Sequence, residues 1–224
     1  MRHRIIFFTE NHSKYAEVAE YLASNKEKYS NIIVEYCPPL TSTPEIQSLD
    51  REEIVRTKLM SIGLTTQNTA IKPAVEDETL WIVAEDTSLN IEKFGGFPGP
   101  FVKFFLQSMP LFNICELTRN SPASSIVSLA IAKLEKGGYF MVDKMFEWRY
   151  FEGVVKGIIS HTPRGINGFG FDPIFVPTDS GENSLMKTNA EYTTTEKNNI
   201  NPRTIAFEAL FNWLLKQNVQ ESSQ

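Results

Sequence analysis

Apolar and polar positions along the chain predict strands and helices that alternate through the first half, followed by strands that cluster in the middle. Strands are predicted at 4–9, 31–36, 79–84, 124–134 and 139–160, and the last of these is broken near Gly153. The segment 161–177 is predicted to be a loop that runs into a further strand. Helices are predicted at 13–24, about 50–63, 101–109, 111–118 and about 204–216. Asp50 followed by Glu53 forms a capping box for the second helix. This order of elements indicates an α/β protein with a mixed sheet.

The chain length suits one large domain or two closely joined lobes. It has 224 residues, 42% of them hydrophobic, which is enough for a substantial core. We predict one domain over 1–215 and a polar, frayed tail over 216–224. No apolar run approaches the roughly 20 residues of a membrane helix, and the start does not resemble a signal peptide. Because no apolar run is long enough, we expect no membrane as partner. Cys37 and Cys115 are too few for a disulfide framework, which indicates a reducing compartment, so we expect a cytoplasmic protein.

The charge balance limits the kind of partner. The net charge is −5, from 22 Lys and Arg residues against 27 Asp and Glu residues. A protein that coats nucleic acid usually carries a basic excess, so we expect no nucleic acid polymer as partner. If the protein binds a smaller polyanion, its positive charges have to be gathered locally.

Two adjacent acids, Glu85 and Asp86, follow the predicted strand 79–84 and precede a stretch dense in Gly and Pro. Strand ends in α/β folds are where ligand groups gather. Neighbouring side chains on an extended segment point to opposite faces, so one acid would face a ligand and the other would be held nearby. A carboxylate in such a place can bind Mg²⁺ or accept a proton from water. Alternatively, the pair caps the following turn.

Four more segments carry candidate chemistry, and each has an ordinary structural explanation. The segment 95–101 has glycines that allow close backbone approach, and Lys103 follows it in a helix. The junction 9–14 offers Asn11, amides at a helix start and Lys14, which suits phosphate but lacks the glycines of a P-loop. These two segments would otherwise be a turn with a solvated lysine and a helix cap.

The other two segments could recognise a base. In the segment 168–175, Phe169 and Phe171 flank a glycine and could stack on a planar ring, although two buried phenylalanines are the usual explanation. In the segment 196–203, Lys197 and Arg203 can donate hydrogen bonds but not accept them. The ordinary explanation of this segment is a solvated approach to the last helix.

Taken together and in order, these segments resemble the inosine triphosphate pyrophosphatase family over about residues 4–214. The segment "PEIQ" resembles the part of the family that carries an acidic metal ligand, and "EKNNINPR" resembles its E-K-N-x-x-S-H-R motif. "PGPFVKFFL" is similar to the eukaryotic branch. The family's T-x-N-x-x-K, E-D-T/S-x-L, G-G-x-P-G and aromatic-Gly-aromatic-Asp-Pro motifs are matched by Thr9, Asn11, Lys14, Glu85, Asp86, Thr87, Leu89, Gly95, Gly96, Pro98, Gly99, Phe169, Phe171, Asp172 and Pro173.

The resemblance implies an elongated mixed central sheet flanked by helices, with two lobes around a nucleotide-binding cleft, usually as a homodimer. It also implies hydrolysis of non-standard purine nucleoside triphosphates (ITP, dITP and XTP) between the α- and β-phosphates. The products would be a nucleoside monophosphate and pyrophosphate, and the reaction would remove mutagenic nucleotides from the pool. The implied cofactor is Mg²⁺, with Mn²⁺ as an alternative.

The resemblance also implies a role for each matched residue. Glu45 and Asp86 would hold the metal, with Glu85 beside them and Asp86 as the residue that activates water. The triphosphate would be held by Thr9, Asn11, Lys14, Lys58, Thr87 and Lys103, with Lys14 also counted among the catalytic residues. Phe169 and Phe171 would stack on the purine, and Asp172, Lys197 and Arg203 would contact the base or sugar.

One motif departs from the family pattern, because Ser-His-Arg is replaced by Asn201, Pro202 and Arg203. In the family, His and Arg reach the 6-oxo group of the purine. A donor-only arginine leaves the amino group of adenine without an acceptor, at roughly 1–3 kcal/mol, so ATP is refused. Proline removes one side-chain donor and one backbone N–H, and it biases the preceding residue away from helical geometry.

Three consequences of this departure remain open. Arg203 alone preserves selectivity for the 6-oxo group, or selectivity relaxes with Asn201 as a substitute donor, or the protein mainly binds nucleotides or a partner with little turnover. The presence of all the metal and phosphate residues favours an enzyme. The final Gln224 would suit a product cut from a virus-encoded polyprotein by a glutamine-specific protease, but an ordinary terminus is the simpler explanation.

Overall fold

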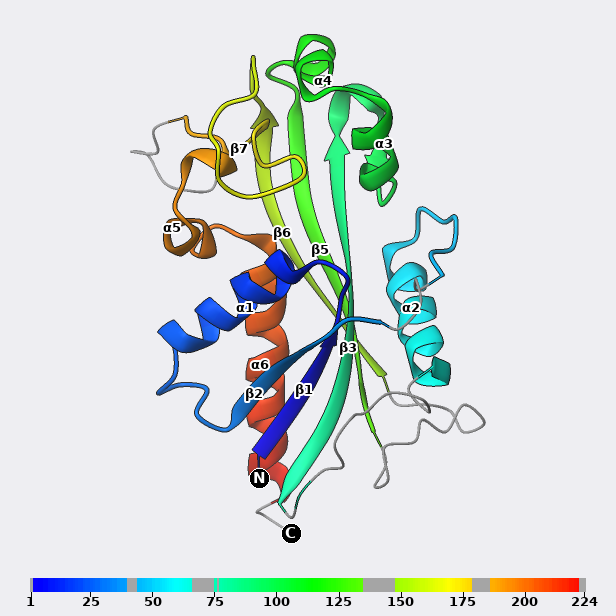
Figure 1. The fold of residues 1–224 in the computed structure, drawn as a ribbon, viewed down its shortest axis with the longest axis vertical. Helices are drawn as coiled ribbons and strands as arrows, with labels where there is room; N and C mark the ends of the chain where they lie inside the picture. The colour runs from blue at the N-terminus through cyan, green and yellow to red at the C-terminus, as the bar shows by residue number, and fades with distance from the viewer. Residues whose placement is uncertain are drawn as a thin grey trace. The chain divides into compact units, whose positions relative to one another are not determined.

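The computed structural model describes residues 2–39, 44–65, 75, 77–134, 148–178 and 186–221, whose strands form a seven-stranded sheet (Figure 1). The strands are β1 (Arg2–Phe8), β2 (Ile32–Cys37), β3 (Glu78–Ile91), β4 (Pro98–Gly99), β5 (Pro122–Lys133), β6 (Trp148–Ile159) and β7 (Phe175–Pro177). The helices are α1 (His12–Ser24), α2 (Arg51–Thr65), α3 (Val102–Ser108), α4 (Leu111–Thr118), α5 (Thr194–Asn198) and α6 (Pro202–Glu221), with 3-10 turns η2 (Glu92–Phe94) and η3 (Asn189–Glu191). The predicted α/β fold with a mixed sheet and flanking helices is confirmed.

The order of strands is β2-β1-β3-β5-β6-β7, and β4 pairs with β3 outside this row. β1 is parallel to both β2 and β3, whereas β4 is antiparallel to β3 and β7 is antiparallel to β6. The last residue of β1, Phe8, is paired with Cys37 on one side and with Ala84 on the other. The next residues of β3, Glu85 and Asp86, therefore lie just past the carboxyl end of β1, where ligand groups gather in parallel sheets.

The chain forms two compact units. Unit 1 comprises residues 1–86, 128–151 and 207–224, and unit 2 comprises residues 87–127 and 152–206. Strands β3, β5 and β6 and helix α6 each contribute residues to both units. The single domain over 1–215 and the cleft between two lobes stay predictions.

In unit 1, alternate residues of β1 pack against helices on opposite faces of the strand. Ile6 and Phe8 belong to a core cluster with Val55, Leu59 and Ile62 of α2. On the other face, the Phe7 ring lies 5.3 Å from the ring of Phe207 in α6, measured between centroids. Because both faces are covered, the second half of β1, residues 5–8, is a continuous apolar run. Figure 1 shows α1 and α6 on one side of β1 and α2 on the other.

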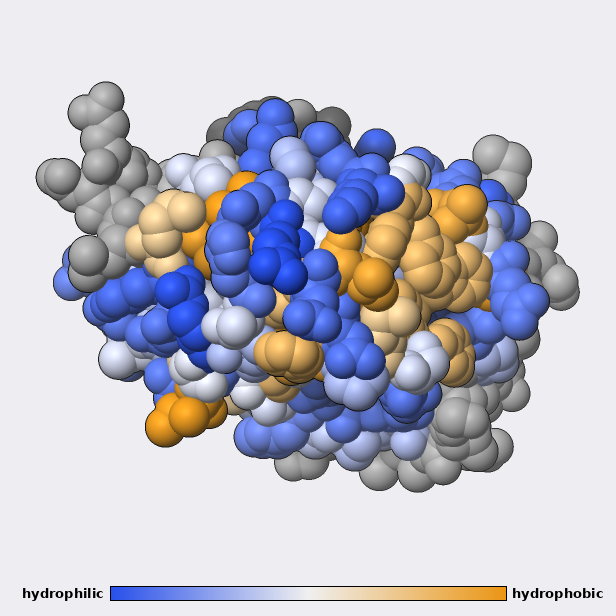
Figure 2. Space-filling model, turned by 90° about the horizontal axis from the view of Figure 1, so that it is seen from above, coloured by the Kyte–Doolittle hydropathy of each residue, from blue (hydrophilic) through white to orange (hydrophobic). Residues whose placement is uncertain are grey.

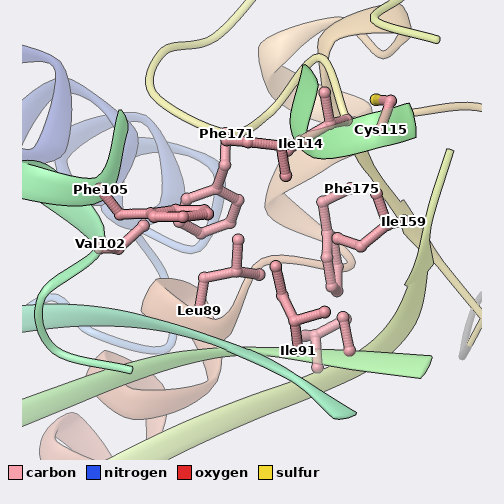
Figure 3. Close-up of a cluster of buried hydrophobic side chains, with 12 residues drawn as sticks. Leu89, Ile91, Val102, Phe105, Ile114, Cys115, Ile159, Phe171 and Phe175 are labelled. Atoms are coloured by element: carbon pink, nitrogen blue, oxygen red, sulfur yellow. The ribbon is translucent and has the colours of Figure 1, made fainter. Parts of the chain in front are cut away.

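In unit 2, a cluster of buried apolar side chains packs α3 and α4 against the sheet (Figure 3). Leu89, Ile114, Ile159 and Phe175 in this cluster have no exposed surface. At roughly 25 cal/mol per Å² of apolar surface removed from water, such burial is the main stabilising contribution to a unit of this kind. The two short helices predicted at 101–109 and 111–118 are therefore confirmed, because each covers part of this core.

Two strand predictions were wrong in length. β3 runs from Glu78 to Ile91 rather than over 79–84, so Glu85 and Asp86 lie inside the strand and not at its exit. β6 is continuous through Gly153. A Cβ at Gly153 would lie 2.0 Å from the Pro202 carbonyl oxygen, so this glycine lets α6 approach β6 instead of breaking the strand. The predicted strand residues 139–147 lie outside the described residues.

The last helix is longer than predicted. α6 begins at Pro202 and continues to Glu221, past the expected end at 216. The proline at its first position costs no hydrogen bond, because the N–H groups of the first helical turn have no partner within the helix. Part of the segment expected to be a frayed tail therefore continues the helix, and residues 222–224 lie outside the described residues.

The surface seen from above combines hydrophilic areas with an orange area of apolar side chains (Figure 2). The segment 97–117 alone exposes Phe97, Phe104, Phe112 and Leu117, each by 47–56%. In the described parts of the chain, no helix has both the length and the apolar composition needed to cross a membrane.

Candidate active site

Glu85 and Asp86 point to opposite faces of β3, and each contacts a lysine from a different helix. The Glu85 carboxylate lies 2.9 Å from Nζ of Lys14 in α1. Asp86 Oδ1 lies 3.1 Å from Nζ of Lys58 in α2. Asp86 points to the same face of β3 as Ala84, two residues earlier, and Ala84 packs in the cluster that contains the apolar face of α2. The two acids therefore belong to two separate ion pairs, as the strand geometry predicts.

Lys58 occupies a position on the buried stripe of α2, with Ile54, Val55, Leu59 and Ile62 as buried neighbours in the helix. Its side chain is only 10% exposed. A buried ammonium needs partners for its three donors.

Three acceptors surround that ammonium. Nζ of Lys58 lies 3.1 Å from Oε1 of Glu45, 3.1 Å from Oδ1 of Asp86 and 3.2 Å from the Glu85 carbonyl oxygen. Burial lowers the pKa of Lys58, but the carboxylates of Asp86 and Glu45 outweigh it, and the net effect raises that pKa. Lys58 is therefore a permanent positive charge in this cluster.

Burial and the neighbouring lysines have opposite effects on the pKa of Asp86. Burial raises the pKa of Asp86, and this effect exceeds the lowering by the nearby ammonium groups of Lys58 and Lys14. Its second oxygen, Oδ2, is buried and has no hydrogen-bond partner among the described residues. A buried carboxylate oxygen without a partner costs free energy, so it is well suited to accept a cation or a water proton.

The donor set fits Mg²⁺ only in part. Among the described residues, no group of three or more His, Cys, Asp or Glu could hold a metal ion. Two carboxylates, Glu45 and Asp86, nevertheless meet at one ammonium, and Oδ2 of Asp86 offers a further lone pair. Mg²⁺ is usually held by one or two carboxylates together with substrate phosphates and water. The residues therefore fit a metal that shares its ligands with a phosphate compound.

The start of α1 supplies hydrogen-bond donors near Lys14 in the sequence. The Asn11 Oδ1 atom caps the helix by accepting the N–H of Ser13 at 2.9 Å, and the Thr9 hydroxyl oxygen accepts the N–H of Asn11 at 3.1 Å. The amide oxygen of Asn11 is thus committed to the cap, while its NH₂ group can face an anion. An N-terminus of a helix attracts negative charge, which suits the predicted phosphate role.

In unit 2, Asp172 organises the predicted base-binding loop from within. Its Oδ2 accepts hydrogen bonds from Nζ of Lys197 at 2.7 Å and from the backbone N–H of Phe169 at 2.8 Å. The side chains of Asp172 and Lys197 are each 7% exposed. Gly168 has a φ of +77°, and a Cβ there would lie 2.2 Å from Asp172 Oδ2. The loop is therefore wrapped around this carboxylate, which positions Phe169 and has little surface left for direct contact with a base.

Phe169 is half-buried and carries two cations over its ring. Nζ of Lys197 lies 5.0 Å from the ring centroid, and Cζ of Arg203 lies 5.7 Å from it. Both distances are within the range of cation–π attraction. The Arg203 guanidinium also donates a hydrogen bond to the Thr87 hydroxyl at 3.4 Å. Four of the predicted base and sugar residues therefore form one cluster in unit 2, with Thr87 at its edge.

Phe171 does not belong to this cluster, and its stacking role stays a prediction that its burial does not support. It is 8% exposed and lies in the hydrophobic core of unit 2. Figure 3 shows its ring near Phe105 and Leu89, and its ring centroid is 6.2 Å from that of Phe175. The alternation of a strand does not apply here, because Gly168 and Gly170 both have positive φ and redirect the chain. Phe169 therefore faces the cations of Lys197 and Arg203, and Phe171 fills the core.

The Asn201-Pro202-Arg203 segment starts α6. Asn201 Oδ1 accepts the backbone N–H of Arg203 at 2.9 Å, and Pro202 is the first helical residue. Asn201 and Arg203 are both buried, at 2% and 3% exposed. The proline therefore fits a capped helix start, and Arg203 keeps its place over Phe169.

Lys103 is exposed in the first turn of α3, so its phosphate role stays a prediction. Asn189 was not predicted: it is 3% exposed, and its Nδ2 lies 3.3 Å from Oδ1 of Asp172. The only sequence signal near it is the capping box from Thr188 to Glu191, which marks a turn but not this contact.

Comparisons with known proteins place the chain in a family. Residues 5–213 match the Ham1 family. The chain is 31% identical to the "dITP/XTP pyrophosphatase" of Pyrococcus horikoshii, with 94% of this chain and 96% of the relative covered. It is 32% identical to the "Inosine triphosphate pyrophosphatase" of Saccharomyces cerevisiae, with 96% of each covered.

A solved structure agrees with the fold. The structure of a HAM1 protein from Coxiella burnetii covers 96% of this chain and 100% of its own, with a TM-score of 0.68 and 24% identity. At that identity the likeness shows the fold alone. The family match over nearly the whole chain confirms the resemblance seen in the sequence: this protein belongs to the Ham1 family.

Proposed function

We propose that this protein hydrolyses non-standard purine nucleoside triphosphates, with ITP, dITP and XTP as substrates, to the nucleoside monophosphate and pyrophosphate. The relatives named as ITP and dITP/XTP pyrophosphatases, about 30% identical over most of the chain, support this activity. The observation that carries it in the structure is the pair of opposed carboxylates in β3. Each of them meets a lysine from a different helix just past the end of β1.

The phosphate groups are assigned to donors of unit 1. Lys14, Lys58 and the NH₂ group of Asn11 are donors, and Thr9 fixes the backbone that presents Asn11. Glu85 orients Lys14 through the 2.9 Å ion pair. Phosphoryl transfer is catalysed mostly by positioning and by neutralising charge, and lysines held by buried carboxylates are pre-positioned for both.

Glu45 and Asp86 are the residues assigned to Mg²⁺, with Mn²⁺ as an alternative. When bound, the metal would neutralise phosphate charge and polarise the phosphoryl oxygens. Asp86 has a second role as the base that accepts a proton from the attacking water. Its raised pKa and its unpartnered Oδ2 support that role, because a catalytic base works best with a pKa closer to the operating pH.

Base recognition is assigned to the Phe169 cluster of unit 2. Arg203 and Lys197 are donors without acceptors, so they favour a 6-oxo group and offer nothing to the amino group of adenine. Asp172 acts as a positioning residue that holds Phe169 and Lys197. The placement of Arg203 behind the Asn201 cap supports the first of the three consequences, in which Arg203 preserves selectivity without the histidine.

The test is pyrophosphate release from ITP, XTP, dITP, ATP and GTP with Mg²⁺, with the wild type and Pro202→His compared. Hydrolysis of the first three at rates well above those for ATP is expected. Absence of turnover on all five, restored by Pro202→His, would instead favour the nucleotide-binding alternative. The homodimer and the cytoplasmic location stay predictions of the sequence.

A further inference from the structure

We propose that Lys58 holds the place of a cation between Glu45 and Asp86 in the free protein, so that a divalent metal binds tightly only together with nucleotide. This inference rests on the proposed function and adds to it a coupling between the two ligands. It concerns how this chain's own residues control entry of the metal.

The contacts of Lys58 make it a competitor for the metal's ligands. Its Nζ is 3.1 Å from a carboxylate oxygen of Glu45 and 3.1 Å from a carboxylate oxygen of Asp86. Mg²⁺ binds oxygen at about 2.0–2.1 Å and demands near-octahedral geometry. An ion bound to the same two carboxylates would either take the lone pairs that the ammonium now uses or lie within a few ångströms of a second cation.

The charges of the cluster point in the same direction. Lys58, Glu45 and Asp86 together carry one net negative charge, and Lys14 and Glu85 neutralise each other. Adding Mg²⁺ alone would leave one net positive charge beside the buried side chains of Lys58 and Asp86, which is unfavourable. A triphosphate brings several negative charges, so it compensates the metal and offers Lys58 a new acceptor.

The free protein also lacks an easy alternative position for Lys58. The position lies on the buried stripe of α2, and the third contact of Nζ is the Glu85 carbonyl oxygen. If Lys58 moved away from both carboxylates while no phosphate was bound, its buried ammonium would lose the charges that compensate it. Metal and nucleotide are therefore expected to increase each other's affinity by the same factor, as linkage requires.

The first measurement uses the wild-type protein. Mn²⁺ is the probe, and its free concentration is read by electron paramagnetic resonance with and without the α,β-methylene analogue of ITP, which cannot be cleaved at the reacting bond. With the analogue present, the protein is expected to bind Mn²⁺ at least about tenfold more tightly than without it. Mn²⁺ that binds to the analogue itself is subtracted from this comparison. Equal Mn²⁺ affinity with and without the analogue would overturn the inference, whatever the behaviour of any variant.

The second measurement uses Lys58→Met, which removes the ammonium and keeps an unbranched side chain. In the absence of nucleotide, this variant is expected to bind Mn²⁺ at least about tenfold more tightly than the wild type, and its coupling to nucleotide should shrink. Lys14→Met is the matched control, because Lys14 is the neighbouring lysine of the site and its ion pair is with Glu85. Lys28→Met, in an exposed pair with Glu208, gives the baseline.

The outcomes separate this inference from the proposed function. Unchanged or weaker Mn²⁺ binding by folded Lys58→Met, in a wild type that hydrolyses ITP, would overturn the inference and leave the function intact. A wild type that binds Mn²⁺ but neither binds nor hydrolyses nucleotide would overturn the proposed function. An equal gain in Lys14→Met and Lys58→Met would reduce the effect to general charge and contradict the specific role of Lys58.

Discussion

Nζ of Lys58 and Oδ1 of Asp86 lie 3.1 Å apart, and the side chains that carry them are only 10% and 12% exposed. A structural ion pair of this kind is seldom worth its desolvation, because well-packed apolar side chains often stabilise a protein equally well. Two further atoms at the pair are ones that a ligand would use. They are the Glu45 carboxylate oxygen that Lys58 also contacts and the unpartnered Oδ2 of Asp86. The pair is therefore better explained by function than by stability.

Asp86→Asn is predicted to fold normally and to lose turnover. The amide keeps the shape and still accepts a hydrogen bond from Lys58, but it holds a metal poorly and takes no proton from water. A loss of about 10²–10⁴-fold in kcat for ITP is expected, the usual contribution of a general base. Circular dichroism and pyrophosphate release check both halves of the prediction. The matched control is Glu35→Gln, at a half-exposed acid that pairs with Arg4, and near-wild-type turnover in Asp86→Asn would remove Asp86 from the mechanism.

The same substitution has a predicted effect on stability that depends on pH. Because burial raises the pKa of Asp86 in the folded protein, the folded state holds that proton more firmly than the unfolded chain does. The charged form therefore costs stability, and the cost grows as pH rises from the unfolded value of about 3.9 through the raised folded pKa. In chelator-treated buffer, the melting temperature of Asp86→Asn relative to that of the wild type is therefore expected to rise from pH 4 to pH 7. A relative melting temperature that falls over this range would contradict the sign.

Phe169 and Phe171 are predicted to respond oppositely to truncation, although they belong to one motif. Phe171→Ala opens a cavity in the core of unit 2 and should cost about 3–5 kcal/mol of unfolding free energy. Phe169→Ala removes the half-buried ring beneath Lys197 and Arg203, so it should raise KM for ITP with a much smaller loss of stability. Denaturant unfolding and steady-state kinetics on both variants decide this. A large stability loss in Phe169→Ala with unchanged KM would assign that ring to the core as well.

Gly168→Ala is predicted to damage the base-binding loop more than Gly95→Ala damages its own turn. Both glycines have positive φ, +77° and +63°, so the backbone strain is similar. A Cβ at Gly168 would lie 2.2 Å from Asp172 Oδ2, whereas a Cβ at Gly95 would meet no atom within 4 Å. The difference in melting temperature and in KM for ITP between the two variants therefore isolates the contact with Asp172. Equal effects would mean that the loop tolerates displacement of that carboxylate.

Much of the fold followed from periodicity and local signals. The Asp50 cap is an example: its Oδ1 accepts the N–H groups of Glu52 and Glu53, as the sequence predicts. The reciprocal half of the predicted capping box does not form, because the Asp50 N–H donates to the Ser48 hydroxyl at 3.1 Å and Glu53 accepts from that hydroxyl at 2.7 Å. The length of β3 was missed because polar residues interrupt its apolar run, and two of them, Glu85 and Asp86, are the carboxylates that pair with lysines.

The roles within the site were less predictable than its members. The alternation of a strand correctly separated Glu85 from Asp86, because that rule needs only an extended backbone. The three-way contact of Lys58 depends on how α2 and the segment around Glu45 pack on the sheet, which is tertiary information. Positive φ at Gly168 and Gly170 broke the expected symmetry of Phe169 and Phe171 in the same way.

The measurement that tests the central claim most directly is pyrophosphate release with Mg²⁺ from ITP and ATP, in the wild type and in Asp86→Asn. The account predicts hydrolysis of ITP to the monophosphate and pyrophosphate, slow or absent hydrolysis of ATP, and loss of ITP turnover in the variant. Release of inorganic phosphate instead of pyrophosphate, or equal rates on ITP and ATP, or an active Asp86→Asn, would contradict it.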